Sequence, residues 1–194
     1  MRFILASSSP RRRELLASIG VEFDVLPSQI PEEHQPGEAP EEYVARLSRE
    51  KANAVATQHP SHWVIAADTT VLLGDQLLEK PLDEHDAARM LSLIAGRTHV
   101  VYTGVTLQNV ERKYQETRVA ESEVRMLPLP PEDVEWYVRT GEPMDKAGAY
   151  AVQGIGAWFI EAIEGSYTNV VGLPLSTLFN MMRRAGIDPL RPAL

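Results

Sequence analysis

The chain has 194 residues and a mass of 21.6 kDa, with 44% hydrophobic and 24% charged residues. This length fits one globular domain, or one domain with an added lobe, that buries a real core. The composition excludes a disordered or fibrous protein. The formal net charge of −8 argues against a nucleic-acid polymer as a partner, because proteins that bind such polymers usually present a broad basic face.

The sequence contains no cysteine, which excludes disulfides, thiolate-bound zinc and cysteine nucleophiles. Its five histidines are scattered and lack the spacing of a zinc-peptidase helix. Any metal is therefore expected to be a hard cation held by carboxylate oxygens. No run approaches the roughly 20 apolar residues that a membrane span requires, so we expect a cytoplasmic protein without a membrane partner.

The predicted elements alternate between strands and helices along the chain. Short strands are expected at residues 2–6 and 21–26, with a helix between them that begins after Ser9 and ends at Gly20. Further predictions are helices at 40–58, 82–96, 130–141 and 174–185 and strands at 63–68, 98–110, 113–127 and 157–165. This order predicts a mixed α/β fold, with an inserted hairpin, in a single domain over residues 1–194.

Residues 7–13, SSSPRRR, lie at the turn between the first strand and the first helix. A helix N-terminus binds anions, and the hydroxyl of Ser7 with the guanidinium groups of Arg11 and Arg12 adds donors suited to phosphate. Cations in a first helical turn also oppose the helix dipole, a conflict that an anionic ligand would relieve. The alternative is a solvated basic turn, and this motif alone leaves both readings open.

Two charged residues interrupt apolar patterns. Lys51 falls on the same face of its predicted helix as Val44 and Leu47, so its ammonium either reaches water past the core edge or meets an anion. Asp68 lies in the apolar run VIAADTTVLL, at the expected carboxyl end of a buried strand, where ligands bind in open α/β sheets. Burying this carboxylate is costly unless it meets a metal or cations, and a structural role in a turn is the alternative.

Three weaker candidates lie in loops. Glu32, or its neighbour Glu33, could supply a second carboxylate to a magnesium ion, because Mg²⁺ typically takes only one or two protein carboxylates. Lys80 could contact a phosphate. The amide of Gln153 offers a donor beside an acceptor, which matches the edge of uracil or thymine, whereas the same amide flipped would suit cytosine. Solvated loop residues are the alternative for all of them.

The sequence lacks GxxxxGK[ST] and GxGxxG, so neither a P-loop nor a dinucleotide fingerprint is present. Instead, motifs spread over the chain resemble, in order, those of the Maf family of nucleoside triphosphate pyrophosphatases: SSSPRR, REKA, AADTTV, LEKP, GRTHVVYTGV, GEPMDKAGAYAVQG and GSYTNVVGLPL. The resemblance implies an α/β fold similar to that of inosine triphosphate pyrophosphatases, with an elongated sheet and a cleft between two lobes.

The resemblance also implies roles for individual residues. Asp68 matches the family's proton acceptor and metal-site carboxylate, and Glu32 matches a loop carboxylate that assists the metal or water, although the alignment could shift to Glu33. Residues matching the cations that bind the triphosphate are Arg11, Arg12, Lys51 and Lys80. The implied cofactor is a divalent cation, Mg²⁺ with Mn²⁺ or Co²⁺ as alternatives.

Within the family, the subgroup that acts on dTTP and UTP resembles this chain at Arg12, Thr69 and Gln153. The implied function is therefore hydrolysis of dTTP, UTP or modified pyrimidine nucleotides to the monophosphate and pyrophosphate, in a house-cleaning role. Two alternatives remain open at this stage: hydrolysis of 7-methyl-GTP, and a nucleotide-binding inhibitor of septum formation with low turnover. A homodimer is one assembly state that the sequence leaves open.

Overall fold

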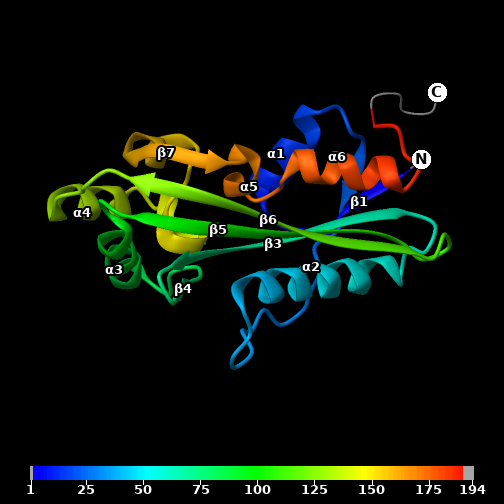
Figure 1. The fold of residues 1–194 in the computed structure, drawn as a ribbon, viewed down its shortest axis with the longest axis horizontal. Coiled ribbons are helices and arrows are strands. Elements are labelled where there is room, and N and C mark those ends of the chain that lie inside the picture. The colour runs from blue at the N-terminus through cyan, green and yellow to red at the C-terminus, as the bar shows by residue number, and fades with distance from the viewer. Residues whose placement is uncertain (1, 190–194) are drawn as a thin grey trace. The chain divides into compact units, whose positions relative to one another are not determined.

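The computed structural model describes residues 2–189. Its seven strands form one mixed sheet in the order β2-β1-β3-β5-β6-β7, with β4 paired to β3 (Figure 1). The strands are β1 (Phe3–Leu5), β2 (Phe23–Val25), β3 (Trp63–Leu73), β4 (Gln76–Leu78), β5 (Thr98–Asn109), β6 (Tyr114–Met126) and β7 (Ile160–Gly165). β1 runs parallel to β2 and β3, whereas the β3–β4 and β6–β7 pairs are antiparallel.

Helices flank the sheet. They are α1 (Pro10–Ser18), α2 (Pro40–Ala56), α3 (Glu84–Ile94), α4 (Pro131–Arg139), α5 (Tyr167–Val171) and α6 (Leu175–Arg184), with short 3₁₀ turns η1 (Glu142–Asp145), η2 (Ala147–Ala149) and η3 (Gly154–Phe159). The predicted mixed α/β fold is therefore confirmed. Within residues 2–189, no helix is long and apolar enough to cross a membrane.

The chain divides into two compact units. Of the described residues, the first unit contains 2–68, 103–120 and 172–189, and the second contains Thr69–Tyr102 and Glu121–Val171. The strands β3, β5 and β6 each contribute residues to both units. Asp68 is the last residue of the first segment of unit one, and Thr69 begins unit two.

In the first unit, helices cover both faces of the strands (Figure 1). Val64 and Ala66 of β3 pack with α2, whereas Ile65 and Ala67 belong to the core that includes Leu16 of α1 and Leu178 of α6. Because side chains alternate across a strand, the next even-numbered residue, Asp68, points toward the α2 side of the sheet.

Gly104 of β5 allows α2 to approach the sheet closely. A Cβ built on Gly104 would lie 2.2 Å from the carbonyl oxygen of Val44, so any larger residue would push the helix outward. One turn later, Ser48 Oγ and Thr106 Oγ1 are 2.9 Å apart and form a buried hydrogen bond. These contacts fix α2 on β5 within two helical turns of Lys51.

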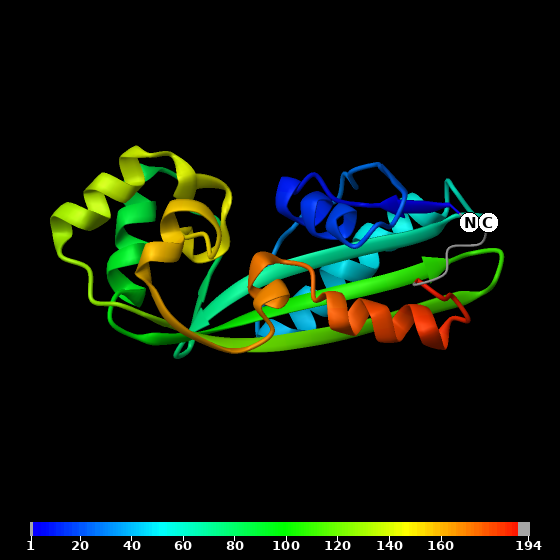
Figure 2. The same cartoon turned by 90° about the horizontal axis from the view of Figure 1, so that it is seen from above.

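The second unit has its own core, in which Leu91 of α3, Tyr137 of α4 and Val124 of β6 are fully or almost fully buried. The helices α3 and α4 lie side by side (Figure 2). The N-terminus of α3 is capped by Asp83, whose carboxylate accepts a 2.8 Å hydrogen bond from the backbone N–H of Asp86.

Two predicted strand boundaries were wrong, and one helix was missed. The strand predicted at 63–68 continues to Leu73, because the β-branched and apolar residues after Asp68 extend it and pair with β4, so Asp68 lies inside a strand and not at its end. The strand predicted from residue 157 begins at Ile160, since the chain first forms η3. The short helix α5 was not predicted.

Candidate functional site

The centre of the candidate site is a buried ammonium between two carboxylates. Lys51 Nζ lies 2.6 Å from Asp68 Oδ1 and 2.9 Å from Glu32 Oε1. The side chains of Lys51 and Asp68 are only 7% and 9% exposed, whereas that of Glu32 is 42% exposed. Asp68 thus contacts the ammonium within the protein interior, and Glu32 contacts the same ammonium from a surface loop.

The fold explains why Lys51 is buried. The apolar face of α2, which includes Val44, Leu47 and Val55, packs toward the sheet, and Lys51 lies on this face. The ammonium consequently meets the side chain that β3 directs toward α2, which is Asp68. A buried charge of this kind needs a hydrogen-bonded partner of opposite sign, and the pair satisfies that requirement for both residues.

A second group of donors comes from the turn after β1. Arg12 Nε donates to the carbonyl oxygen of Gly172 at 2.7 Å, and its Nη1 donates to Ser7 Oγ at 3.2 Å. Ser7 Oγ also accepts a 3.2 Å hydrogen bond from the backbone N–H of Ser9, at the beginning of α1. These bonds hold the first turn of the helix and the Arg12 guanidinium in one arrangement.

Electrostatic interactions join the two groups. Burial lowers the pKa of Arg12 below its ordinary value, while the negative charge of Asp68 opposes this shift; Arg11 and Glu32 also act on the guanidinium. We call Arg11, Arg12, Glu32, Lys51 and Asp68 the charged cluster. With three cations and two carboxylates, the cluster carries a formal charge of +1 in a protein whose net charge is −8, so it favours an anionic ligand.

The carboxylates are also suited to a hard metal. Both belong to one cluster, and a Mg²⁺ ion typically uses one or two carboxylates and completes its shell with water and substrate phosphates. Within residues 2–189, no three or more His, Asp or Glu side chains are grouped to hold a metal by themselves. The two carboxylates match in number and type the protein ligands that a hard divalent cation takes.

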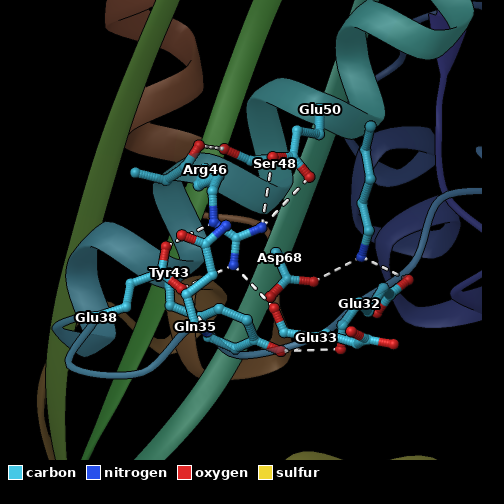
Figure 3. A network of polar contacts seen from close by, with 11 residues as sticks. Glu32, Glu33, Gln35, Glu38, Tyr43, Arg46, Ser48, Glu50 and Asp68 are labelled. Atoms are coloured by element: carbon cyan, nitrogen blue, oxygen red, sulfur yellow. Dashed lines mark hydrogen bonds and ion pairs between the residues drawn. The ribbon is translucent and has the colours of Figure 1, made fainter.

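Glu32 and Glu33 have different positions. The carboxylate of Glu32 contacts Lys51, whereas the backbone carbonyl oxygen of Glu33 accepts a 2.9 Å hydrogen bond from Arg46 Nη2 (Figure 3). The carboxylate that the loop brings to the charged cluster is thus that of Glu32.

The remaining predicted residues belong to the second unit. Thr69 is half-buried and follows Asp68 on β3, so its side chain points to the opposite face of that strand. Lys80 is exposed, and the preceding carbonyl oxygen, that of Glu79, accepts a 3.1 Å hydrogen bond from the N–H of Gly148. A Cβ built on Gly148 would lie 3.1 Å from Val71 Cγ2, so the chain passes close to β3 at this glycine.

Gln153 lies at the start of η3 in a loop that Glu142 holds from within the same unit. The Glu142 carboxylate accepts hydrogen bonds from the N–H groups of Ile155 and Gly156 at 3.0 and 2.8 Å, and from the hydroxyl of Tyr137 at 2.7 Å. Gly154 has a φ of +72°, and a Cβ there would lie 2.2 Å from Glu142 Oε1, so a larger residue would strain the backbone and displace the carboxylate. The backbone that carries Gln153 is therefore firmly positioned.

The sequence did not reveal two residues that hold the loops carrying Glu32 and Gln153. Arg46 contacts the loop that carries Glu32, and Glu142 holds the loop that carries Gln153. Both lie within elements whose patterns predict only a solvated charge. The motif GEPMDKAGAYAVQG contains Glu142, but its spacing from Gln153 gives no sign that the two are joined through backbone hydrogen bonds.

Comparison with known proteins identifies the family. The model of a family described as Maf-like protein matches residues 2–185, so the chain belongs to this family. It is 50% identical over 184 residues to the dTTP/UTP pyrophosphatase of Myxococcus xanthus, covering 95% of this chain and 92% of the relative. It is also 50% identical over 185 residues to the dTTP/UTP pyrophosphatase of Geobacter sulfurreducens, covering 95% and 97%.

Two solved structures share the fold. The Ham1 protein of Staphylococcus aureus matches with a TM-score of 0.52 and 13% identity, and the match covers 95% of this chain and 100% of the Ham1 chain. A HAM1 protein from Coxiella burnetii matches with a TM-score of 0.51 and 13% identity, covering 95% and 99%. At this identity the likeness concerns the fold alone.

The ion pair in the charged cluster generates a stability prediction. In Lys51→Met, Asp68 loses its ammonium partner while remaining buried, so the free energy of unfolding should fall by about 3 kcal/mol, as for other buried pairs broken on one side. Urea unfolding measures the change. Lys113→Met, which removes an exposed lysine, is the control and should change stability by less than about 0.5 kcal/mol.

A second variant separates charge from packing. Adding Asp68→Asn to Lys51→Met removes the uncompensated carboxylate, so the double variant should regain much of the lost stability. If Lys51→Met behaves like Lys113→Met, the ammonium does not hold a buried Asp68 in solution, and the described centre is wrong.

Proposed function

We propose that this protein is a nucleoside triphosphate pyrophosphatase that hydrolyses dTTP and UTP to the monophosphate and pyrophosphate. The observation that carries the proposal is the charged cluster, in which a buried Asp68 lies among three cations and a second carboxylate. Relatives that are 50% identical over nearly the whole chain are named dTTP/UTP pyrophosphatase, which supports the same substrates here. Modified pyrimidine triphosphates fall in the same substrate class.

In the proposed reaction, Asp68 orients a water molecule and accepts its proton as the oxygen attacks the α-phosphorus. Lys51 donates to Oδ1 of Asp68 at 2.6 Å and so fixes the orientation of the carboxylate before substrate arrives. Pre-positioning of this kind removes part of the entropic barrier to attack. General-base catalysis by a positioned side chain typically contributes about 10²- to 10⁴-fold in rate.

The cations neutralise the phosphates. Arg12 offers a guanidinium fork whose position is fixed by Gly172 and Ser7, and such forks suit phosphate oxygens. Arg11 and Lys51 add positive charge beside it, and Lys80 of the second unit is proposed as a further phosphate contact. Positive charge aimed at the leaving pyrophosphate lowers the barrier by electrostatic stabilisation.

A divalent cation, Mg²⁺ or alternatively Mn²⁺ or Co²⁺, is proposed to bind to the carboxylates of Glu32 and Asp68. When bound, it would polarise the phosphate oxygens and add positive charge at the reacting phosphate. Within the protein, Lys51 holds these two carboxylates near one point, which keeps both available to a cation that arrives with the nucleotide.

Base recognition is assigned to Gln153 and Thr69. The Gln153 amide can donate to O4 and accept from N3–H of uracil or thymine, provided that its orientation is fixed. The hydrogen bonds of Glu142 to Ile155 and Gly156 fix the backbone beside it. The names of the relatives do not favour the 7-methyl-GTP alternative or a septum inhibitor with low turnover. We further propose a house-cleaning role in the cytoplasm.

The function is tested with Asp68→Asn and a substrate panel. The wild-type protein should release pyrophosphate and the monophosphate from dTTP and UTP faster than from CTP, ATP, GTP or 7-methyl-GTP, in the presence of Mg²⁺, Mn²⁺ or Co²⁺. Asp68→Asn keeps the shape of the side chain but removes the base, so kcat for dTTP should fall by at least about 10²-fold.

The control is Asp75→Asn, which changes an exposed carboxylate in the turn between β3 and β4 and should leave kcat unchanged. Hydrolysis of dTTP by Asp68→Asn at a rate close to that of the wild type would rule out the assigned base. A panel in which 7-methyl-GTP is the preferred substrate would reject the pyrimidine assignment.

The assignment of Gln153 has its own test. Gln153→Ala removes the proposed contact with the base, so kcat/KM should fall more for dTTP and UTP than for the purine nucleotides, by about 10-fold or more for a lost pair of hydrogen bonds. Steady-state kinetics over the same panel measure this ratio, with the exposed Gln76→Ala as control. An equal loss for every base would show that Gln153 does not read the base.

A further inference from the structure

The carboxylate of Glu32 lies on an exposed loop between β2 and α2. Residues Pro31 to Gly37 of this loop are all exposed, so little apolar burial holds its conformation. Yet Glu32 Oε1 is placed 2.9 Å from the buried Lys51 ammonium. Loops with few buried contacts open easily, so another interaction must fix the backbone that presents Glu32.

Arg46 of α2 supplies this interaction (Figure 3). Its Nε and Nη2 donate to the two oxygens of Glu38 at 2.6 and 2.7 Å, and Nη2 also donates to the carbonyl oxygen of Glu33 at 2.9 Å. The Arg46 and Glu38 side chains are only 17% and 9% exposed. One guanidinium therefore forms hydrogen bonds with the loop at both ends of the segment 33–38.

Glu38 is itself tied back to the loop. Its Oε2 accepts a 3.2 Å hydrogen bond from the N–H of Gln35, and its own N–H donates to the carbonyl oxygen of Gln35 at 3.1 Å. The hydrogen bond from Arg46, opposed by partial burial, lowers the pKa of Glu38 below its ordinary value, so the carboxylate stays ionised and the pair intact at neutral pH. The loop is a small closed structure fastened to α2 by a bidentate ion pair.

A second fastening lies next to Glu32. The hydroxyl of Tyr43 is 3.4 Å from the carbonyl oxygen of Glu32, and the Arg46 guanidinium lies 5.6 Å from the centre of the Tyr43 ring. Tyr43, Arg46 and Lys51 all project from α2. The same rigid helix thus carries the ammonium that Glu32 meets and the side chains that hold the loop delivering it.

We propose that Arg46 is a positioning residue for Glu32. Its hydrogen bonds to Glu38 and Glu33 hold the loop in the conformation that places the Glu32 carboxylate in the charged cluster. Arg46 does not contact the reacting atoms in this account; it acts through Glu32. The inference deepens the proposed function and rests on it for its effect on turnover, while its effect on the loop is independent of any substrate.

Amide hydrogen exchange tests the loop without substrate. In Arg46→Met, the hydrogen-bonded amides of Gln35 and Glu38 should exchange at least about 10-fold faster than in the wild type, because the ion pair that holds the loop closed is lost. Glu50→Gln is the matched control: Glu50 accepts from the same Arg46 side chain at 3.4 Å, but it lies on α2 and does not touch the loop, so exchange should not change. Unchanged exchange in Arg46→Met would overturn the inference.

Turnover of dTTP tests whether Arg46 acts through Glu32. Arg46→Met should lower kcat by about 10-fold, since small displacements of a positioned group are costly, with a smaller change in KM. In a Glu32→Gln background, Arg46→Met should cause no further loss. Arg46→Lys, which keeps the charge but lacks the fork, should fall between the wild type and Arg46→Met.

An equal loss in both backgrounds would show that Arg46 acts independently of Glu32 and would overturn the inference. If the wild-type protein hydrolyses none of the nucleotides, the proposed function fails instead. The exchange rates of Arg46→Met and Glu50→Gln then still decide whether Arg46 fastens the loop.

Discussion

The candidate site depends on one interaction, the contact of the Lys51 ammonium with the carboxylates of Asp68 and Glu32. An ion pair of this kind is a weak source of net stability, because removing both charges from water costs about as much as their attraction returns. A well-packed apolar pair could fill the same space. The arrangement is better explained by the proposed function, because it orients the Asp68 carboxylate beside cations that suit a polyphosphate.

The fold supplies this arrangement from elements far apart in sequence. Alternation along β3 turns Asp68 toward α2, Gly104 lets that helix approach the sheet, and the apolar face of α2 carries Lys51 to the carboxylate. The turn after β1 adds Arg12, whose guanidinium is held by a backbone carbonyl and by Ser7. Packing and hydrogen bonds within the protein therefore position Asp68, Lys51 and Arg12, as the proposed electrostatic catalysis requires.

Some of this could be predicted from the sequence. The periodicity of residues 40–58 already placed Lys51 on a buried face, and the apolar run around Asp68 marked a carboxylate that needed a partner. The sequence did not show that the two meet, since strand alternation and helix placement are tertiary facts. Periodicity also did not predict the length of β3, because strand formers on both sides of Asp68 leave no signal for where pairing ends.

The supporting residues were beyond sequence reasoning for a different reason. In the sequence, Arg46 looks like an ordinary exposed charge with an ion-pair partner, Glu50, one helical turn away. Its shorter hydrogen bonds, however, go to Glu38 and Glu33 of the preceding loop and not to Glu50. Glu142 similarly bonds to backbone N–H groups more than ten residues later, at Ile155 and Gly156. The conformation of an irregular loop follows from such contacts and has no periodicity that would reveal them.

In the proposed reaction, the charged cluster directs water at the α-phosphorus while the cations hold the departing pyrophosphate. The position of attack can be measured by hydrolysing dTTP in water enriched in oxygen-18 and analysing both products by mass spectrometry. Attack at the α-phosphorus places one labelled oxygen in thymidine monophosphate and none in pyrophosphate. Label in the pyrophosphate would show attack on the β-phosphorus and would rule out the proposed reaction.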